Sequence, residues 1–379
     1  MLEIYDLIRK AKKYDYIIIF GFSPMGKEVY QEFNRSELKC NIYFCDNDEK
    51  KQDHKEVFSV ADAVRKYADA LFVTVSFYHY QSMKEQLYEE GVEDNNIENY
   101  MPYGYRVRND MERMFRRITP LPELQFEVDL ANHCNLNCKF CDHFSPLAEK
   151  RYPKFEQFEK DMNRLSFLFK GQAKRIFLLG GEPLLNSSIH KYMKCVRDAF
   201  PVADILVYTN GLLLEKMGRE FWEECKKSAI RIAITKYPIS ENVYQKMEEK
   251  CNNEQADWEY VGNTSICKYS YHYPLDLDGK QDARDMFLHC NNANECITLK
   301  EGKLYTCSVA PNIENFNKFF QQNIELNQDD GIDIYEANTA REILTFLSCP
   351  ISFCRYCKVH ERTYDHEWGI SNKEISEWT

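Results

Sequence analysis

The stretch Ala131-Asn132-His133-Cys134-Asn135-Leu136-Asn137-Cys138-Lys139-Phe140-Cys141 follows directly after residues 125–130, a predicted strand. Its three cysteines are spaced C-x3-C-x2-C, so their thiolates can converge on one metal centre from a single loop. Three thiolates are one fewer than a closed zinc site or a [4Fe–4S] cluster normally takes. The spacing therefore indicates either a cluster with one open iron or a zinc knuckle completed by His133 or His143.

Strands and helices alternate downstream of this loop. Residues 155–169 give the clearest helical pattern, with apolar residues on one face. Strands are expected at 125–130, 175–179, 205–209, 229–235 and 258–261, with further helices at 189–200 and 213–227. Such repeated βα units predict a barrel or part of one, whose chemistry sits at the carboxyl ends of the strands. The cysteine loop follows the first of these strands.

The first hundred residues predict a separate, parallel βαβ sheet, with strands at 16–20, 41–45 and 71–76 and helices at 27–33 and 81–90. The turn Gly21-Phe22-Ser23-Pro24-Met25-Gly26 is a G-x-G-x-x-G pattern with Ser in the middle position, and Asp46 lies where a ribose-binding acid would sit. Ser23 places a Cβ where a pyrophosphate should approach. The domain is either a nucleotide-binding module or a scaffold or docking module.

Composition narrows the function classes. The chain has 60 acidic and 49 basic residues, a net charge of −11, which disfavours nucleic-acid and anionic-membrane partners. The sequence holds no apolar run of about 18 residues. The first sixteen residues lack the apolar core of a secretory signal. We therefore expect a cytoplasmic protein with reduced thiols, in which grouped cysteines bind metal instead of forming disulfides.

A second cysteine group occupies the last 90 residues. Its pattern is Cys290-x11-Gly302-x4-Cys307 followed by Cys354-x2-Cys357, which supplies the four thiolates of a second [4Fe–4S] cluster. A structural zinc site with four cysteines is the alternative. Two further cysteines fit neither slot, and we leave them as ligands of an additional cluster, substitutes for a member of the four, or inert thiols: Cys296 and Cys349.

The first cysteine loop, with Phe140 before its last cysteine, resembles that of the radical SAM superfamily. The resemblance implies that Cys134, Cys138 and Cys141 hold a [4Fe–4S] cluster. Its open iron would be chelated by the amino and carboxylate groups of S-adenosylmethionine. One-electron reduction would then cleave the sulfonium and release a 5′-deoxyadenosyl radical.

Three later segments strengthen this resemblance, although each alone is typical of a turn or a strand end. Gly180-Gly181-Glu182-Pro183 follows the second barrel strand and resembles the family segment that binds the methionine amino group, where a carboxylate can accept a charge-assisted hydrogen bond. Thr209 and Asn210, after the third strand, resemble residues near the cofactor. Thr235 and Lys236, after the fourth strand, would reach the cofactor carboxylate or ribose.

The second cysteine group resembles the SPASM/twitch extensions of radical SAM enzymes, most closely the twitch form with one auxiliary [4Fe–4S] cluster. A second auxiliary cluster stays open. The resulting domain organisation is a Rossmann-like domain at 1–105, a linker at 106–123, a partial (β/α)6 barrel at 124–285 and an auxiliary-cluster domain at 286–379. The N-terminal domain also resembles modules attached to bacterial sugar and surface-polysaccharide enzymes.

The expected function is therefore a radical SAM oxidoreductase acting on a small polar substrate such as a sugar, cyclitol or nucleotide sugar. Hydrogen abstraction would give oxidation or epimerisation, with the auxiliary cluster as electron conduit and a flavodoxin- or ferredoxin-type electron donor. Asp142 and His143 are the candidate catalytic residues, because a histidine can orient a hydroxyl or take its proton near neutral pH. The alternatives are a peptide- or protein-modifying maturase and a non-catalytic, metal-stapled binding protein.

Overall fold

The computed structural model describes residues 4–36, 38–76, 80–100, 121–261 and 268–379. Most of the linker expected at 106–123 lies outside these residues. The chain divides into two compact units, Met1–Glu112 and Arg113–Thr379, and each is described by itself.

The first unit contains a five-stranded parallel sheet in the order β3-β2-β1-β4-β5. This is the order of the first five strands of a dinucleotide-binding fold. Its strands are β1 (Tyr16–Phe20), β2 (Asn41–Cys45), β3 (Val57–Phe58), β4 (Leu71–Thr74) and β5 (Ile97–Asn99). Its helices are α1 (Ile4–Ala11), α2 (Pro24–Arg35), α3 (Glu49–Gln52), α4 (Val60–Lys66) and α5 (Tyr80–Glu89). The Rossmann-like expectation is confirmed at the level of fold.

The central strand β1 is buried from both sides, which explains its unbroken run of Ile17, Ile18 and Ile19. Ile17 and Ile19 belong to one apolar cluster and Ile18 to another, so the sheet separates two cores. α2 starts earlier than expected because Ser23 caps it: the Gly26 N–H donates to the Ser23 hydroxyl over 3.1 Å.

The second unit is built on an eight-stranded sheet in the order β10-β9-β8-β7-β6-β12-β13-β14. All pairs from β10 to β12 are parallel, and β13 and β14 continue the sheet antiparallel. The strands are β6 (Gln125–Ala131), β7 (Arg175–Gly180), β8 (Asp204–Thr209), β9 (Arg231–Ile234), β10 (Trp258–Tyr260), β12 (Thr298–Lys300), β13 (Lys303–Tyr305) and β14 (Gly331–Asp333). The parallel half confirms the α/β fold class.

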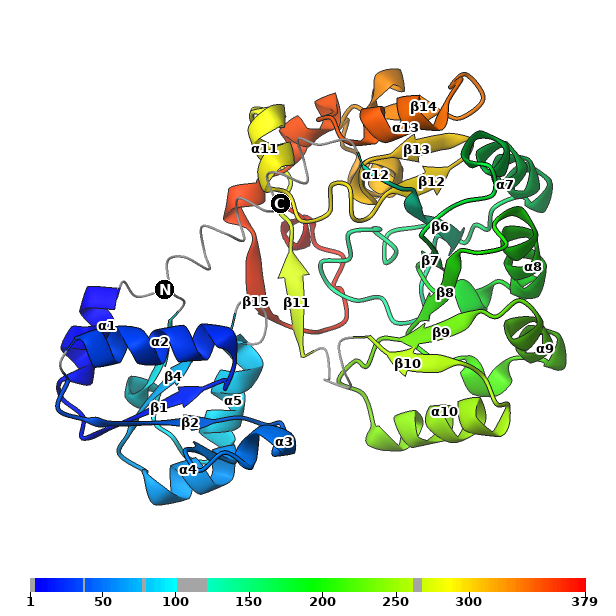
Figure 1. The fold of residues 1–379 in the computed structure, drawn as a ribbon. Coiled ribbons are helices and arrows are strands. Elements are labelled where there is room, and N and C mark those ends of the chain that lie inside the picture. Colours follow the sequence, from blue (N-terminus) through cyan, green and yellow to red (C-terminus); the bar gives the residue numbers. More distant parts are fainter. Residues whose placement is uncertain (1–3, 37, 77–79, 101–120, 262–267) are drawn as a thin grey trace. The chain divides into compact units, whose positions relative to one another are not determined.

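Helices cover the outer side of this sheet (Figure 1). They are α7 (Phe155–Phe169), α8 (Ile189–Ala199), α9 (Arg219–Lys227) and α10 (Glu241–Asn253). α7 buries Phe158, Met162 and Leu165 against the strands, as its helical pattern predicts. α9 begins later than expected, because Gly218 is its N-cap and only a short 3₁₀ turn precedes it.

The C-terminal residues carry more regular structure than their composition indicates. They form α11 (Ala283–His289), α12 (Val309–Phe320), α13 (Ala340–Leu347) and a two-stranded antiparallel sheet of β11 (Tyr269–His272) and β15 (Thr363–Glu367), visible side by side in Figure 1. β12 pairs in parallel with β6, so the region that bears the second cysteine group extends the barrel sheet. The first cysteine group therefore follows β6, and Cys290 and Cys307 of the second group flank the β12–β13 hairpin beside it.

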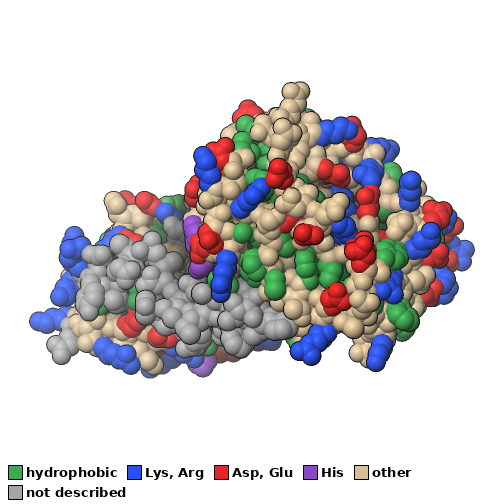
Figure 2. Space-filling model, turned by 90° about the horizontal axis from the view of Figure 1, so that it is seen from above, with side chains coloured by type: hydrophobic (Ala, Val, Ile, Leu, Met, Phe, Trp, Pro, Cys, Tyr) green, Lys and Arg blue, Asp and Glu red, His purple; other side chains and the backbone are tan. Residues whose placement is uncertain are grey.

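The surface of this unit is mixed in charge. Figure 2 shows Lys and Arg interspersed with Asp and Glu over the visible face, and no single-sign patch gathers among the side chains coloured there. Within the described ranges, every helix is too short or too polar to cross a bilayer.

Candidate metal centres

The first cysteine loop leaves the carboxyl end of β6, where barrel chemistry is expected. Cys134, Cys138 and Cys141 are all half-buried and unoxidised. Burial, followed by the charges of Asp142 and the other two cysteines, raises the pKa of Cys141 to about 12. Burial also raises the pKa of Cys134. The three sulfurs thus lie near enough to repel one another as thiolates, an arrangement that a bound cation relieves.

Residues far from the cysteine loop in the sequence hold this loop in place. The Trp368 indole donates to the Cys138 sulfur over 3.1 Å, and the Trp378 indole donates to the Cys141 carbonyl over 2.9 Å. Backbone bonds join Lys139 to Gly369 over 2.8 Å and Ser371 to Asn137 over 2.8 Å. The residues 368–378 therefore form a clamp over the cysteine loop. Sequence reasoning missed this clamp, because no local pattern encodes pairing between segments so far apart.

The two glycines of the GGEP segment allow the backbone to approach the cysteine loop. The Gly181 N–H donates to the Ala131 carbonyl over 2.7 Å, and the Glu182 N–H donates to the His133 carbonyl over 3.1 Å. A Cβ at Gly181 would lie 2.2 Å from the His133 oxygen, and one at Gly180 would lie 2.4 Å from the Ala131 oxygen. These positions accept only glycine.

The Glu182 side chain is 1% exposed and connects this segment to the next motif. One carboxylate oxygen accepts from the Thr209 hydroxyl over 2.7 Å and the Leu184 N–H over 3.0 Å. The other accepts from the Asn210 N–H over 3.0 Å. Burial raises the pKa of Glu182 to about 7, although these hydrogen bonds lower it. Pro183 opens a 3₁₀ turn directly after it.

Asn210 completes the connection to the cysteines. Its amide donates to the Asn135 side chain over 2.8 Å and contacts the Cys134 sulfur at 3.8 Å. Thr209 and Asn210 are both buried. The ends of β6, β7 and β8 thus form one hydrogen-bonded cradle beside the first cysteine group, as expected for three motifs at one edge of a parallel sheet.

The segment Thr235-Lys236 is less closely associated with this cradle. The Thr235 N–H donates to the Thr209 carbonyl over 3.0 Å, so its backbone adjoins the third motif. The Lys236 ammonium pairs with Glu241 at 3.3 Å and lies over the rings of Tyr244 and Tyr260. Its charge is therefore used beside α10.

Phe140 packs against the rings of His272 and His366 at 4.9 and 4.7 Å.

The candidate catalytic pair lies between the two cysteine groups. The Asp142 carboxylate accepts from Asn292 over 3.1 Å and from Ser308 over 3.1 Å. His143 is nearly enclosed, with its Nδ1 at 3.2 Å from Asp129 and its Nε2 at 3.8 Å from Glu127. Sequence reasoning missed both β6 carboxylates; their alternation with Phe126 and Val128, which pack toward the helices, is the signal that places them on the other face.

The surroundings of His143 favour its protonated form. Burial lowers its pKa, but the neighbouring charges of Asp129, Asp142 and Glu127 outweigh burial and raise the pKa to about 10. In its protonated form His143 can donate a hydrogen bond and orient a hydroxyl. Its expected role as a proton acceptor stays a prediction.

The second cysteine group lines a small, largely apolar cavity. Cys290, Cys307 and Cys357 contribute to its walls together with Tyr273 and Arg362. Cys354 is buried beside it, and burial with the nearby Cys290 charge raises the Cys354 pKa to about 12. The pKa of Cys357 is raised by burial and by all three other cysteines. The four expected ligands are thus brought together.

Arg362 supplies buried positive charge to this cavity. Its Nη2 donates to the His289 carbonyl over 2.8 Å, but its Nε and Nη1 are buried without a hydrogen-bond partner. Buried unpaired donors are costly. A cationic side chain in the wall of a cavity that Cys290, Cys307 and Cys357 also line fits an anionic iron–sulfur centre, whose charge and sulfur atoms it would satisfy. No sequence pattern singles out this arginine.

The two remaining C-terminal cysteines differ in place. The Cys296 thiol is buried near Glu127, Asp142, Cys307 and Cys290, and burial is the main cause of its raised pKa. It therefore lies between the second group and β6. Cys349 is exposed and its thiol donates to the Thr345 carbonyl over 3.3 Å, away from the cavity-lining set.

The N-terminal turn uses its own donors. The Phe22 N–H donates to the Asp46 carboxylate over 2.7 Å, and the Gly26 N–H donates to the Ser23 hydroxyl over 3.1 Å. These two backbone N–H groups are therefore not directed at a ligand. Asp46 also pairs with Lys51 at 3.1 Å. Gly26 is required by packing, since a Cβ there would lie 2.0 Å from the Gly21 oxygen.

Comparisons with known proteins agree with the geometry of the first group. Residues 128–257 match the family model of the Radical SAM superfamily. The chain is similar to a GTP 3′,8-cyclase of Staphylococcus epidermidis, 26% identical over 34% of this chain and 38% of the relative. It is also similar to a GTP 3′,8-cyclase of Heliobacterium modesticaldum, 33% identical over 24% of this chain and 28% of the relative. The chain thus spans well under half the length of these curated relatives.

Among solved structures, similarity is found to BtrN in complex with AdoMet and 2-DOIA, with a TM-score of 0.39 and 15% identity over 63% of this chain and 94% of that one. Native anSMEcpe with bound AdoMet gives a TM-score of 0.38 and 10% identity over 62% and 90%. The family match covers β6 through α10, the segment that carries the cysteine loop and the GGEP cradle. This chain therefore contains a radical SAM domain, the kind that binds a [4Fe–4S] cluster and S-adenosylmethionine.

Proposed function

We propose that this protein is a radical SAM oxidoreductase with one auxiliary [4Fe–4S] cluster, acting on a small polar substrate to give oxidation or epimerisation. The observation that carries the proposal is the direct hydrogen bonding between the surroundings of the two cysteine groups. Asp142, next to Cys141, accepts hydrogen bonds from Asn292 and from Ser308, the neighbour of Cys307. Two groups held this closely favour electron transfer between them.

Each group has its own set of residues. Cys134, Cys138 and Cys141 would hold the first cluster, with Phe140 packed beside them. The GGEP cradle would bind the cofactor through Gly180, Gly181, Glu182, Pro183, Thr209 and Asn210. When bound, the reduced cluster and S-adenosylmethionine supply the 5′-deoxyadenosyl radical that abstracts hydrogen. We assign Thr235 a place at the edge of this site, and Lys236 a supporting role through its ion pair with Glu241.

The auxiliary cluster would be held by Cys290, Cys307, Cys354 and Cys357, with Arg362 offsetting its negative charge. Cys296, buried between this group and β6, is the fifth thiol of the region, and Cys349 is outside it. A cluster held there would supply an electron acceptor for a substrate radical. Loss of one hydrogen atom to the deoxyadenosyl radical, one electron to that acceptor and one proton to a base or solvent would amount to a two-electron oxidation of the substrate.

The substrate class follows from the polar groups near the first loop. His143, as an imidazolium beside Asp129, can donate to a hydroxyl or carboxylate oxygen. A cavity of about 530 Å³ lies between β6, β12 and α7, and Asp129, the partner of His143, is one of its lining residues. The similarity to relatives named GTP 3′,8-cyclase supports a substrate that contains a nucleotide. A flavodoxin- or ferredoxin-type donor would deliver the initiating electron in the cytoplasm.

The experiment that tests the proposal compares cysteine variants of anaerobically reconstituted protein. We expect about eight iron atoms in the wild type, four for each cluster, and 5′-deoxyadenosine formation with dithionite. Changing Cys134, Cys138 and Cys141 together to Ala should remove about four irons and all cleavage. Changing Cys354 and Cys357 to Ala should also remove about four irons, yet leave cleavage of S-adenosylmethionine intact.

Cys349→Ala is the matched control and should keep all of the iron. Zinc in place of iron, or S-adenosylmethionine cleavage that survives loss of the first three cysteines, would contradict the proposal. About twelve irons in the wild type, falling in Cys296→Ala, would add a third cluster and correct the count of auxiliary clusters.

A further inference from the structure

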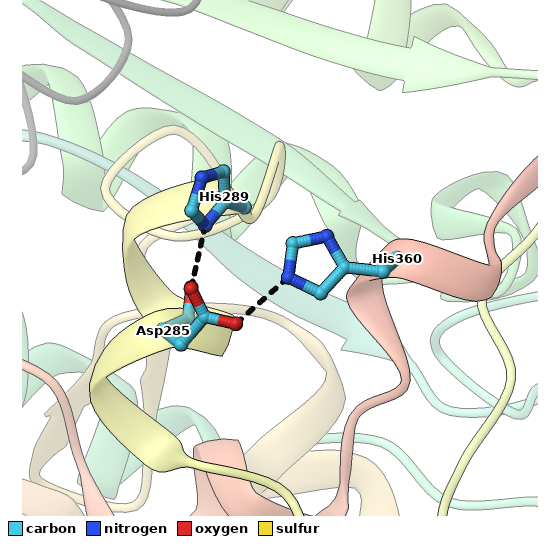
Figure 3. A group of neighbouring side chains, drawn as sticks. All are labelled: Asp285, His289 and His360. Atoms are coloured by element: carbon cyan, nitrogen blue, oxygen red, sulfur yellow. Dashed lines mark hydrogen bonds and ion pairs between the residues drawn. The ribbon is translucent and has the colours of Figure 1, made fainter.

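Three metal-ligating side chains gather on the surface beside the second cysteine group. Asp285 and His289 lie one turn apart on α11, and His360 lies in the 3₁₀ turn η6 (Val359–Glu361). One ligand atom from each lies within 4.8 Å of the other two, the one such trio among the described residues. Figure 3 shows the Asp285 carboxylate facing both imidazole rings.

The distances fit ligands of one metal ion. Asp285 Oδ1 lies 3.1 Å from His289 Nδ1, and Asp285 Oδ2 lies 2.8 Å from His360 Nε2. Tetrahedral zinc with bonds of 2.0–2.2 Å separates its N and O ligands by about 3.4 Å. The His289 Nδ1 also lies 3.0 Å from the Asp285 carbonyl oxygen. Binding of an ion would therefore replace these hydrogen bonds by metal bonds and move the ligand atoms a few tenths of an ångström apart. The two imidazole rings are tilted relative to each other, with 4.9 Å between their centroids.

The ligand types select the class of ion. Two imidazole nitrogens and one carboxylate oxygen favour borderline transition metals such as Zn²⁺, whereas Mg²⁺ and Ca²⁺ prefer all-oxygen sites. Asp285, His289 and His360 are 45%, 36% and 55% exposed at the side chain. That exposure gives an entry path and leaves room for water as the remaining ligand.

The backbone of the trio is already fixed. Asp282 caps α11 by accepting the Asp285 N–H over 2.7 Å, and Arg362 holds the His289 carbonyl over 2.8 Å. Aspartate and histidine four residues apart on a helix present their side chains to the same side. Little ordering would therefore be needed on binding.

We propose that Asp285, His289 and His360 form a binding site for a divalent transition-metal ion such as Zn²⁺, distinct from both cysteine groups. The site joins α11, which leads into Cys290, to η6, which follows Cys357. A bound ion would cross-link the two segments that supply opposite ends of the second cysteine set. The same contacts can also exist as a metal-free ion-pair triad, and the experiment separates the two cases.

The test uses tag-free, anaerobically reconstituted protein with Zn²⁺ as the probe. Protein is incubated with Zn²⁺, passed through gel filtration, and analysed for zinc and iron. We expect about one zinc retained by the wild type, at least about tenfold weaker retention in His360→Ala and Asp285→Asn, and unchanged iron in all proteins. His190→Ala, which removes a histidine paired with Glu220 on the barrel surface, is the matched control and should bind like the wild type.

X-ray absorption at the zinc edge identifies the ligands. A first shell of nitrogen and oxygen with imidazole scattering supports the site, and a sulfur shell would instead place the zinc in a cysteine group and overturn it. Equal zinc retention in all variants, or none in the wild type, would leave only the ion-pair triad. Asp285→Asn keeps the size and shape of the Asp285 side chain and one of its two acceptor oxygens, so it tests the site even where His360→Ala disturbs the fold.

Discussion

The carboxylate of Asp142 accepts a hydrogen bond from the hydroxyl of Ser308 over 3.1 Å. Asp142 directly follows Cys141, and Ser308 directly follows Cys307. One hydrogen bond therefore joins residues adjacent to ligands of both expected centres. The position of each centre is tied to the other through this contact.

Removing this contact should loosen the region without unfolding it. A hydrogen bond to a charged group contributes about 1.5–3 kcal/mol, so Ser308→Ala should accelerate the loss of iron to a chelator severalfold. Chelator-driven iron release, followed by absorbance, measures the effect. Ser166→Ala removes a hydroxyl that donates to the Ala199 carbonyl over 2.6 Å on the outer side of the barrel, and should release iron at the wild-type rate. Indistinguishable rates for both variants would refute a coupling role for Ser308.

Gly181→Ala should abolish the first centre selectively. The added Cβ would meet the His133 oxygen at 2.2 Å and the Cys134 nitrogen at 2.9 Å, so the start of the cysteine loop must shift. We expect about half of the iron to remain and cleavage of S-adenosylmethionine to fall by more than about a hundredfold. Gly218→Ala, where nothing lies within 4 Å of the new Cβ, is the control for an added methyl group. Full iron content and normal cleavage in Gly181→Ala would show that the close approach is not needed.

Arg362→Gln should lower the reduction potential of the second centre. The guanidinium of Arg362 lies in the wall of the cysteine cavity, and its charge stabilises the more negative, reduced state. A fall of some tens of millivolts is expected from loss of one nearby charge. Redox titration followed by electron paramagnetic resonance reports the potential. Arg219→Gln removes an arginine that pairs with Glu223 over 2.5 Å on α9, and should leave the potential unchanged. A potential that moves equally in both variants would argue against a specific role for Arg362.

Glu127 should make stability depend on pH. Burial raises its pKa to about 7, against the opposing charge of His143 and together with the charges of Asp129 and Asp142. A carboxyl whose folded pKa is raised stabilises the fold below its unfolded pKa and loses that contribution as pH rises through about 7. Between pH 6 and 8.5 the wild type should therefore lose on the order of 1 kcal/mol relative to Glu127→Gln.

Thermal melting of both reconstituted proteins across this pH range measures the difference. Glu127→Gln keeps the size of the side chain and its hydrogen bond to Thr298, which spans 2.7 Å in the wild type. Parallel changes in the two melting temperatures would mean that Glu127 does not titrate in this range.

Strong local patterns explain which parts of the fold could be predicted. The strand at 16–20 and the helix at 155–169 coincide with β1 and α7, because an apolar run and an amphipathic period are both long there. β12 and β13 are three residues each, too short to show a period. α12 was not expected, since Pro311 and asparagines obscure its apolar face; the proline sits in its first turn, where its missing N–H costs nothing.

The candidate site also has parts that local sequence patterns predict and parts that they do not. Cysteine spacing and glycine motifs are local, and they identify the two groups and the cradle beside them. Long-range partners are not local. The pairing of His143 with Asp129 depends on how β6 meets its following loop, and Arg362 reaches the cysteine cavity only through the fold of the C-terminal residues. Such contacts follow from tertiary packing, which single-sequence patterns do not express.

The clamp over the first cysteine loop has a consequence for the order of events during biosynthesis. Trp368 touches the Cys138 sulfur across a sequence separation of 230 residues. A ribosome therefore exposes the three cysteines long before it has made the residues that hold their loop. These contacts with the loop can form only after residue 378 has left the ribosome, so the complete surroundings of a cluster in this loop exist only at the end of translation.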